Sequence, residues 1–110
     1  KDLQIFGTGN QKRDYIYIDD LVDALILGLE KKANGQIYNL GYGTGISLKN
    51  MAKLVVQTIG RGKIVFKKWP LDYKEVETGD YISNISKIKK ELGFIPQVDF
   101  KNGILKTIKA

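Results

Sequence analysis

The sequence contains no cysteine and no histidine among its 110 residues. These absences exclude disulfide scaffolds, thiolate or imidazole metal sites, and every catalytic arrangement built on Cys-His or Ser-His. Long apolar runs are also missing, since none approaches the roughly 18 residues of a transmembrane helix, and no signal peptide opens the chain. We therefore expect a soluble, cytoplasmic protein with no membrane partner.

The rest of the composition is that of a globular protein, with 43% hydrophobic and 27% charged residues. A chain of this length forms one domain, residues 1–110, with one modest core. The first residue is Lys1 rather than methionine, which suggests a piece of a larger protein.

Basic residues outnumber acidic ones by 18 to 12, so the net charge is +6. This balance favours anionic partners such as nucleotides or nucleic acid. The longest basic run is only two residues, however, and the lysines are scattered along the chain. This pattern indicates solvated faces rather than a nucleic-acid patch.

Hydrophobic periodicity predicts about four helices, which begin at the caps Asp19, Ser47 and Asp99 and near residue 83 or 84. In the first of them Leu25 and Leu29 belong to the apolar stripe. Runs of β-branched and aromatic residues predict short strands over residues 3–6, 15–18, 36–40 and 63–66. Short strands interleaved with helices indicate a small α/β or α+β unit, and residues 71–82 are expected to be irregular.

The glycine-rich stretches do not match a dinucleotide fingerprint, which needs three glycines at fixed spacing before a helix. Lys12 stands where the third glycine after Gly7 and Gly9 belongs, and residues 41–45 fail in the same way. None of the six tyrosines has a lysine four residues later, the pair that a short-chain dehydrogenase uses for catalysis. We therefore assign turn roles to these glycines, and no catalytic, cofactor-binding or metal-binding residue to this chain.

Arg13 is the most informative charged residue, because it is one of only two arginines and lies between a glycine-rich loop and a predicted strand. A guanidinium at such a position binds a diphosphate through paired hydrogen bonds. An ion pair with Asp14 or another nearby carboxylate is an equally good interpretation.

Residues 5–21, IFGTGNQKRDYIYIDDL, resemble the segment that opens the substrate domain of NAD-dependent nucleotide-sugar epimerases and dehydratases. These enzymes are the extended short-chain dehydrogenase/reductases, of which UDP-glucose 4-epimerase is the familiar member. Further similar blocks follow in the family's order: YNLG at 38–41, SK at 86–87, LGFIP at 92–96 and GI at 103–104. The amino-terminal Rossmann half of these enzymes, with its glycine fingerprint and Tyr-x-x-x-Lys pair, has no counterpart in the sequence.

The resemblance implies a role for several residues. Arg13 would bind the nucleotide diphosphate, and Gln11 would reach the sugar or the phosphates. The strand residues Gln4, Ile5 and Phe6 would lie beside the base, partly through backbone groups. Near the ribose, where the family places an arginine and an acid, this sequence has Asp72 and Glu75, with Lys74 close by; Asn84 replaces the usual aspartate before the Ser-Lys pair.

In the intact enzyme the resemblance implies transient oxidation of the sugar at C4 by NAD, which the absent Rossmann half binds. This chain would be the substrate-binding domain, with a UDP-sugar as the favoured ligand and no activity of its own. A face left bare by the absent half would make the fragment prone to self-association. Two alternatives are a small basic nucleic-acid-binding module, which lacks any recognisable signature here, and a structural remnant without retained binding.

Overall fold

Four short strands form two separate two-stranded sheets in the computed structural model, which describes residues 1–110. The strands are β1 (Asp2–Phe6), β2 (Lys12–Asp14), β3 (Gly45–Ser47) and β4 (Lys63–Lys67). β1 pairs in parallel with β4, and β2 pairs antiparallel with β3, so that Arg13 lies opposite Ile46. The predicted strands at 3–6 and 63–66 are confirmed.

The helices are α1 (Ile18–Leu27), α2 (Leu48–Ile59), α3 (Ser86–Leu92) and α4 (Phe100–Lys109), with short 3₁₀ turns η1 (Lys31–Ala33) and η2 (Lys74–Val76). Two predicted caps are confirmed. The Ser47 hydroxyl accepts a hydrogen bond from Asn50 N at 3.1 Å, and the Asp99 carboxylate accepts one from Asn102 N at 2.8 Å. Mixed short strands and four helices confirm the predicted fold class.

The start of α1 differs from the prediction that Asp19 caps it. No side chain caps this helix, whose preceding residue is Tyr17. The neighbouring Asp20 is instead turned inward, where its two carboxylate oxygens accept hydrogen bonds from Gln97 N and Val98 N, each at 3.0 Å. Asp20 is only 2% exposed, and its carboxylate satisfies two backbone N–H groups of the partly buried loop before α4.

Two predicted strands, 15–18 and 36–40, are wrong. Neither segment has a neighbouring strand, and their aromatic residues pack on helices instead. The ring of Tyr15 lies 5.0 Å from that of Phe100 on α4, and the Tyr38 hydroxyl donates a hydrogen bond to Glu91 on α3. Aromatic and β-branched content therefore did not specify a strand partner, and Ile18 already belongs to α1.

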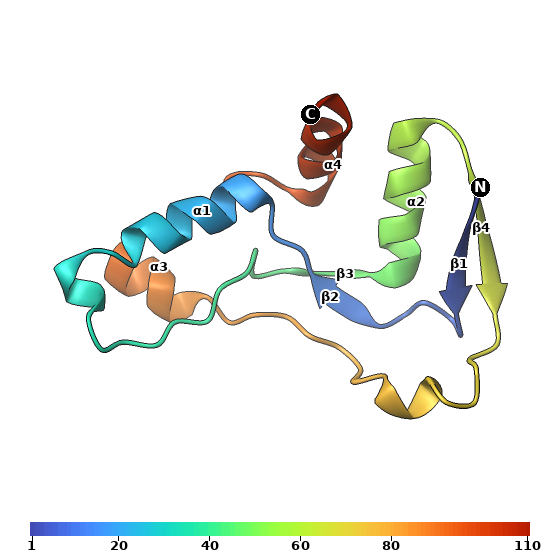
Figure 1. Cartoon of the computed structure of the whole chain (residues 1–110), viewed down its shortest axis with the longest axis horizontal. Coiled ribbons are helices and arrows are strands. Elements are labelled where there is room, and N and C mark those ends of the chain that lie inside the picture. The colour runs from blue at the N-terminus through green and yellow to red at the C-terminus, as the bar shows by residue number, and fades with distance from the viewer.

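The main core lies at one end of the molecule, where α1 and α3 lie side by side (Figure 1). It consists of six buried residues, Ala24, Ala33, Ile85, Ile88, Leu92 and Phe94. Leu25 and Leu29, predicted in the apolar stripe of the first helix, are 62% and 84% exposed, so they lie outside this core, and Leu29 follows the end of α1. The inward side of α1 is formed by Ala24 and Leu27 instead.

The molecule is long and thin, with extents of 48 × 35 × 17 Å. Its radius of gyration is 16.6 Å, whereas a compact domain of this length has about 13 Å. Its accessible surface of 8035 Å² exceeds by about 1,900 Å² that of an ordinary monomer of the same mass. No helix combines the length and apolar character needed to cross a membrane. The chain therefore has a small core and an unusually large exposed surface.

Candidate functional site

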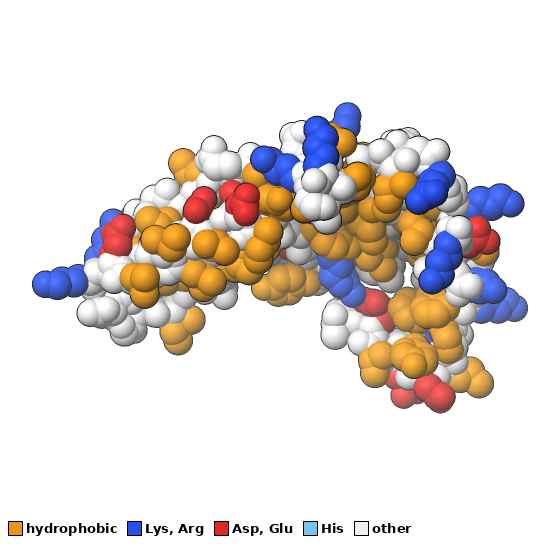
Figure 2. Space-filling model, turned by 45° about the horizontal axis from the view of Figure 1, so that its top comes forward, with side chains coloured by type: hydrophobic (Ala, Val, Ile, Leu, Met, Phe, Trp, Pro, Cys, Tyr) orange, Lys and Arg blue, Asp and Glu red, His pale blue; other side chains and the backbone are white.

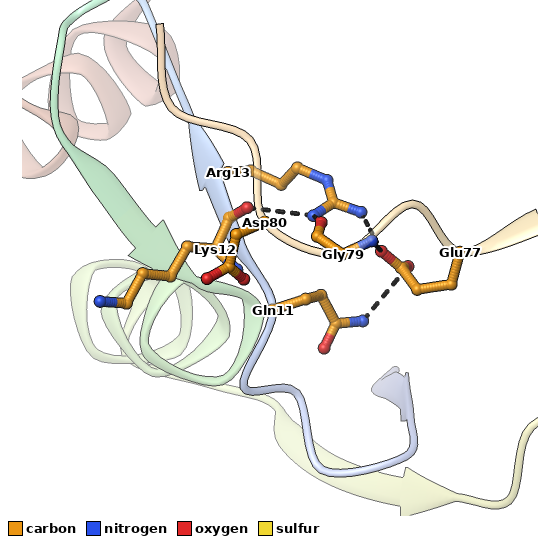
Figure 3. A network of polar contacts seen from close by, with 6 residues as sticks. All are labelled: Gln11, Lys12, Arg13, Glu77, Gly79 and Asp80. Carbon is orange, nitrogen blue, oxygen red and sulfur yellow. Dashed lines mark hydrogen bonds and ion pairs between the residues drawn. The ribbon is translucent and has the colours of Figure 1, made fainter.

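The candidate site forms where β2 meets the segment that follows η2. Arg13 extends from the middle of β2, and residues 77–80 pass beside it (Figure 3). The side chain of Arg13 is 27% exposed and that of Glu77 is 23% exposed. The guanidinium is thus held at the surface rather than buried in the core.

The Arg13 guanidinium donates to three acceptors, one carboxylate and two backbone carbonyls. One terminal nitrogen forms an ion pair with the Glu77 carboxylate, and the other donates to the carbonyl of Gly79. The second nitrogen also donates to the carbonyl of Lys12 at 3.0 Å. The alternative interpretation of Arg13, an ion pair with a nearby carboxylate, is therefore confirmed, and the partner is Glu77 rather than Asp14.

Three donors converge on the carboxylate of Glu77. Besides Arg13, the Gln11 amide donates to it at 3.5 Å and the backbone N–H of Gly79 at 3.0 Å. The hydrogen bond from Arg13 holds the pKa of Glu77 below its ordinary value, although partial burial opposes the shift and the Gly79 and Gln11 donors assist it. Glu77 is therefore ionised at neutral pH.

Backbone hydrogen bonds fix the position of residues 77–83 along β2. Lys12 N donates to the Asp80 carboxylate at 2.8 Å, and Tyr81 N donates to the carbonyl of Lys12 at 3.0 Å. Two residues further along both segments, the Asp14 carboxylate accepts from Ser83 N at 3.1 Å. This arrangement keeps the irregular segment in register with the strand that carries Arg13.

Gly9 allows the loop before β2 to pass close to α2. It has a φ of +70°, and an added Cβ would lie 3.1 Å from the Cβ of Lys49 and 3.2 Å from its backbone nitrogen. Lys49 N donates to Gly9 O at 2.9 Å, and Leu48 N donates to Gln11 O at 3.0 Å. The first amides of α2 thus anchor the loop and orient Gln11 toward Glu77. The turn role predicted for Gly9 is confirmed.

The three residues expected beside the base lie on β1. Gln4 is exposed, Ile5 is 6% exposed and packed inward, and the ring of Phe6 lies 5.6 Å from that of Trp69. Because β1 pairs only with β4, one edge of its backbone remains open. No hydrogen bond or ion pair joins these three side chains to Arg13.

Lys74 and Glu75 lie on the exposed turn η2, and no hydrogen bond or ion pair joins either side chain to Arg13 or Gln11. The sequence interpretation passed over Glu77, the acid that does contact both. The sequence Glu77-Thr78-Gly79-Asp80 carried the available signal, since two carboxylates flank a glycine that can turn the chain. No group of three or more Asp, Glu, His or Cys side chains is close enough together to hold a metal ion.

Comparison with known proteins connects this geometry to a family. The family model described as GDP-mannose 4,6 dehydratase matches residues 1–107. A probable GDP-L-fucose synthase 1 of rice (Oryza sativa subsp. japonica) is 31% identical over 98% of this chain. The matched region is 32% of the rice protein's length.

Solved structures agree in fold. A UDP-glucose 4-epimerase from Thermotoga maritima, solved with UDP-glucose, is 30% identical with a TM-score of 0.87, over 99% of this chain and 34% of that one. A UDP-glucuronic acid 4-epimerase from Bacillus cereus, solved with a UDP-sugar and NAD, is 26% identical with a TM-score of 0.76, over 94% of this chain and 33% of that one. The chain thus spans about a third of the length of the proteins it matches.

Proposed function

The chain belongs to the GDP-mannose 4,6 dehydratase family, within the extended short-chain dehydrogenase/reductases, and on this premise we propose that it binds a nucleotide-diphosphate sugar for an NAD-dependent epimerase or dehydratase. The observation that carries the proposal is the guanidinium of Arg13. It is fixed at the surface of β2, with the Gln11 amide directed at the same point. A planar, charged donor in that position matches the paired oxygens of a diphosphate.

The family resemblance supports roles for the remaining residues. Gln4, Ile5 and Phe6 line the base, with the open backbone edge of β1 supplying polar groups. Lys74 and Glu75 extend from η2 toward the ribose. A UDP-sugar is the favoured ligand, because the similar epimerases from Thermotoga maritima and Bacillus cereus were solved with UDP-sugars.

We place NAD outside these 110 residues, because the glycine-rich segments of this chain do not fit its pyrophosphate. The N–H groups of Tyr42 and Gly43 donate to the Asp14 carboxylate at 2.8 and 3.0 Å. The first amides of α2 are bonded to the loop before β2. A pyrophosphate needs free amides at such a loop or helix start. Binding and orientation of the sugar nucleotide are this chain's contribution, so alone it turns over no substrate.

A Rossmann domain of the same protein would cover much of the exposed apolar surface. A groove of about 390 Å³ lies between α2 and α4, lined mainly by apolar side chains that include Val55, Ile59 and Ile104. Figure 2 shows hydrophobic side chains in this region and along the end that holds α1. The surface excess of about 1,900 Å² is enough for an interface between domains.

A titration followed by NMR tests the phosphate role of Arg13. The 110-residue chain is titrated with UDP-glucose, and we expect a dissociation constant no better than roughly millimolar, because only part of the cleft is present. Arg13→Ala should weaken binding roughly tenfold or more, since a charged hydrogen bond contributes about 1.5–3 kcal/mol. The matched control is Arg61→Ala, the other arginine, which lies beyond α2. Equal affinity in folded Arg13→Ala and Arg61→Ala variants would refute the proposal.

A further inference from the structure

The strands β1 and β4 end side by side, because they run parallel (Figure 1). Gly7 N donates to the carbonyl of Lys67 at 2.8 Å, which keeps the two chains together just beyond the strands. From this end β1 leads through the glycine-rich loop to Gln11 and Arg13, and β4 leads to Trp69. In open α/β sheets, ligands bind at the carboxyl ends of parallel strands. Trp69 therefore enters the region in which the sugar nucleotide is proposed to bind.

The indole of Trp69 is held against the end of β1. Its ring lies 5.6 Å from that of Phe6, at an interplanar angle of 46°. An added Cβ at Gly7 would collide with the indole Nε1 and would lie 3.0 Å from Cδ1, so the ring packs directly on the glycine backbone. Phe6 is one of the residues expected beside the base, and Gly7 begins the loop that leads to the proposed phosphate donors. Trp69 thus contacts the chain where these two parts of the site meet.

Phe6 and Trp69 lie on the face of this sheet that α2 does not cover. Leu3 lines a cavity together with Val55 of α2, so the alternate side chains of β1, Leu3 and Ile5, face that helix. The side chain of Phe6 points to the opposite face, and Trp69 contacts it there. The aromatic pair is therefore accessible to a ligand.

The core of the molecule does not account for Trp69. This residue is half-buried, is absent from the six-residue core, and is the only tryptophan of the chain. No hydrogen bond within the chain uses its indole N–H. An indole combines a large, flat apolar surface with one polar donor, a combination typical of binding surfaces. Such a side chain is suited to a flat, partly polar ring such as a nucleobase.

We propose that Trp69 is a base-binding residue, whose indole forms with Phe6 an aromatic wall on which the nucleobase of the sugar nucleotide stacks. This inference rests on the proposed function and adds a residue that the family resemblance did not indicate. Stacking on an aromatic side chain is open to every base, because every base has a π-face. Trp69 therefore contributes affinity for the base, while the open backbone edge of β1 is left to distinguish one base from another.

The test uses the single indole N–H signal in the proton–nitrogen NMR spectrum of the 110-residue chain. UDP and uridine should shift this signal, whereas inorganic pyrophosphate, which has no base, should leave it in place. Trp69→Leu should weaken UDP binding roughly fivefold or more, because a stacking surface is lost, and should leave the affinity for pyrophosphate unchanged. The matched control is Phe66→Leu, which removes a 50% exposed ring from the opposite face of the same sheet, in register with Ile5, and should bind UDP as wild type does.

A shift of the indole signal by UDP and uridine, together with the selective loss of UDP affinity in Trp69→Leu, supports the inference. Unchanged UDP affinity in Trp69→Leu overturns it and leaves the proposed function intact, as does an equal loss of UDP and pyrophosphate binding. An indole signal that saturating UDP does not move also overturns it, and this measurement on wild type decides the matter if Trp69→Leu does not fold. Absence of UDP binding by wild type overturns both the inference and the proposed function.

Discussion

At the scale of single residues, aspartates organise the irregular backbone of this chain. Asp14, Asp20 and Asp80 each accept hydrogen bonds from backbone N–H groups far away in sequence. Asp14 accepts from three, those of Tyr42, Gly43 and Ser83. These hydrogen bonds hold irregular segments that have no strand partner. The position of Arg13 on β2 therefore depends on Asp14 and Asp80, although neither carboxylate is bonded to Arg13.

Asp14→Ala should destabilise the fold by about 2–3 kcal/mol, because three partly buried N–H groups lose their acceptor. Urea unfolding of the 110-residue chain measures the change. Asp23→Ala, at an exposed position on α1, is the control and should change stability by less than about 0.5 kcal/mol. Equal effects of the two variants would contradict the organising role of Asp14.

The ion pair of Glu77 predicts a pH dependence of stability. Arg13 lowers the pKa of Glu77 in the folded state below its ordinary value of 4.5. A lowered folded pKa means that the stabilising contribution is present above the unfolded pKa and is lost as pH falls through the folded one. The difference in unfolding free energy between wild type and Glu77→Gln should therefore be constant from pH 6 to 8 and shrink below about pH 4.5. A difference that grows on acidification, measured by urea unfolding at several pH values, would exclude this assignment.

At the scale of elements, polar side chains at the helix starts differ in whether they accept a hydrogen bond from the first turn. Ser47 and Asp99 accept from the third residue that follows, whereas Asp19 makes no such bond. Ser47→Ala should cost about 1 kcal/mol, because an amide in the first turn of α2 loses its acceptor. Asp19→Ala should cost no more than about 0.5 kcal/mol, the contribution of a charge near the helix dipole. Thermal unfolding followed by circular dichroism compares them; a larger loss in Asp19→Ala would restore the predicted cap.

Local signals were enough to predict most elements but not their partners. Ser47 and Asp99 determine helix starts through contacts within three residues, and the structure confirms both. Residues 15–18 have strand composition, yet whether they pair depends on segments far away in sequence, which composition does not report. The pairing of Arg13 with Glu77 spans 64 residues and was not predictable for the same reason.

At the scale of the whole molecule, the sequence pattern indicated a core that the fold does not fully provide. Leu25 directly follows the buried Ala24 and therefore lies on another side of the helix, so α1 presents apolar side chains on two sides and only one side meets α3. Composition reports how much apolar surface a chain carries, and it does not report whether the same chain covers it. The large accessible surface and the shortest extent of 17 Å agree with a unit whose exposed apolar faces are suited to packing against another domain.

The exposed stripe of α1 should make the isolated chain self-associate. Ile18, Val22 and Leu25 on α1 and Leu29, just beyond its end, follow one another at intervals of four, three and four residues and are 43–84% exposed. Such a stripe gains free energy when two copies bury it together. Sedimentation velocity at several concentrations should show association that a Leu25→Lys/Leu29→Lys double variant weakens strongly. Leu71→Lys, at an isolated leucine that is 94% exposed, is the control and should behave as wild type. A chain that stays monomeric at every concentration, or a double variant that associates as wild type does, would show that α1 is not the associating surface.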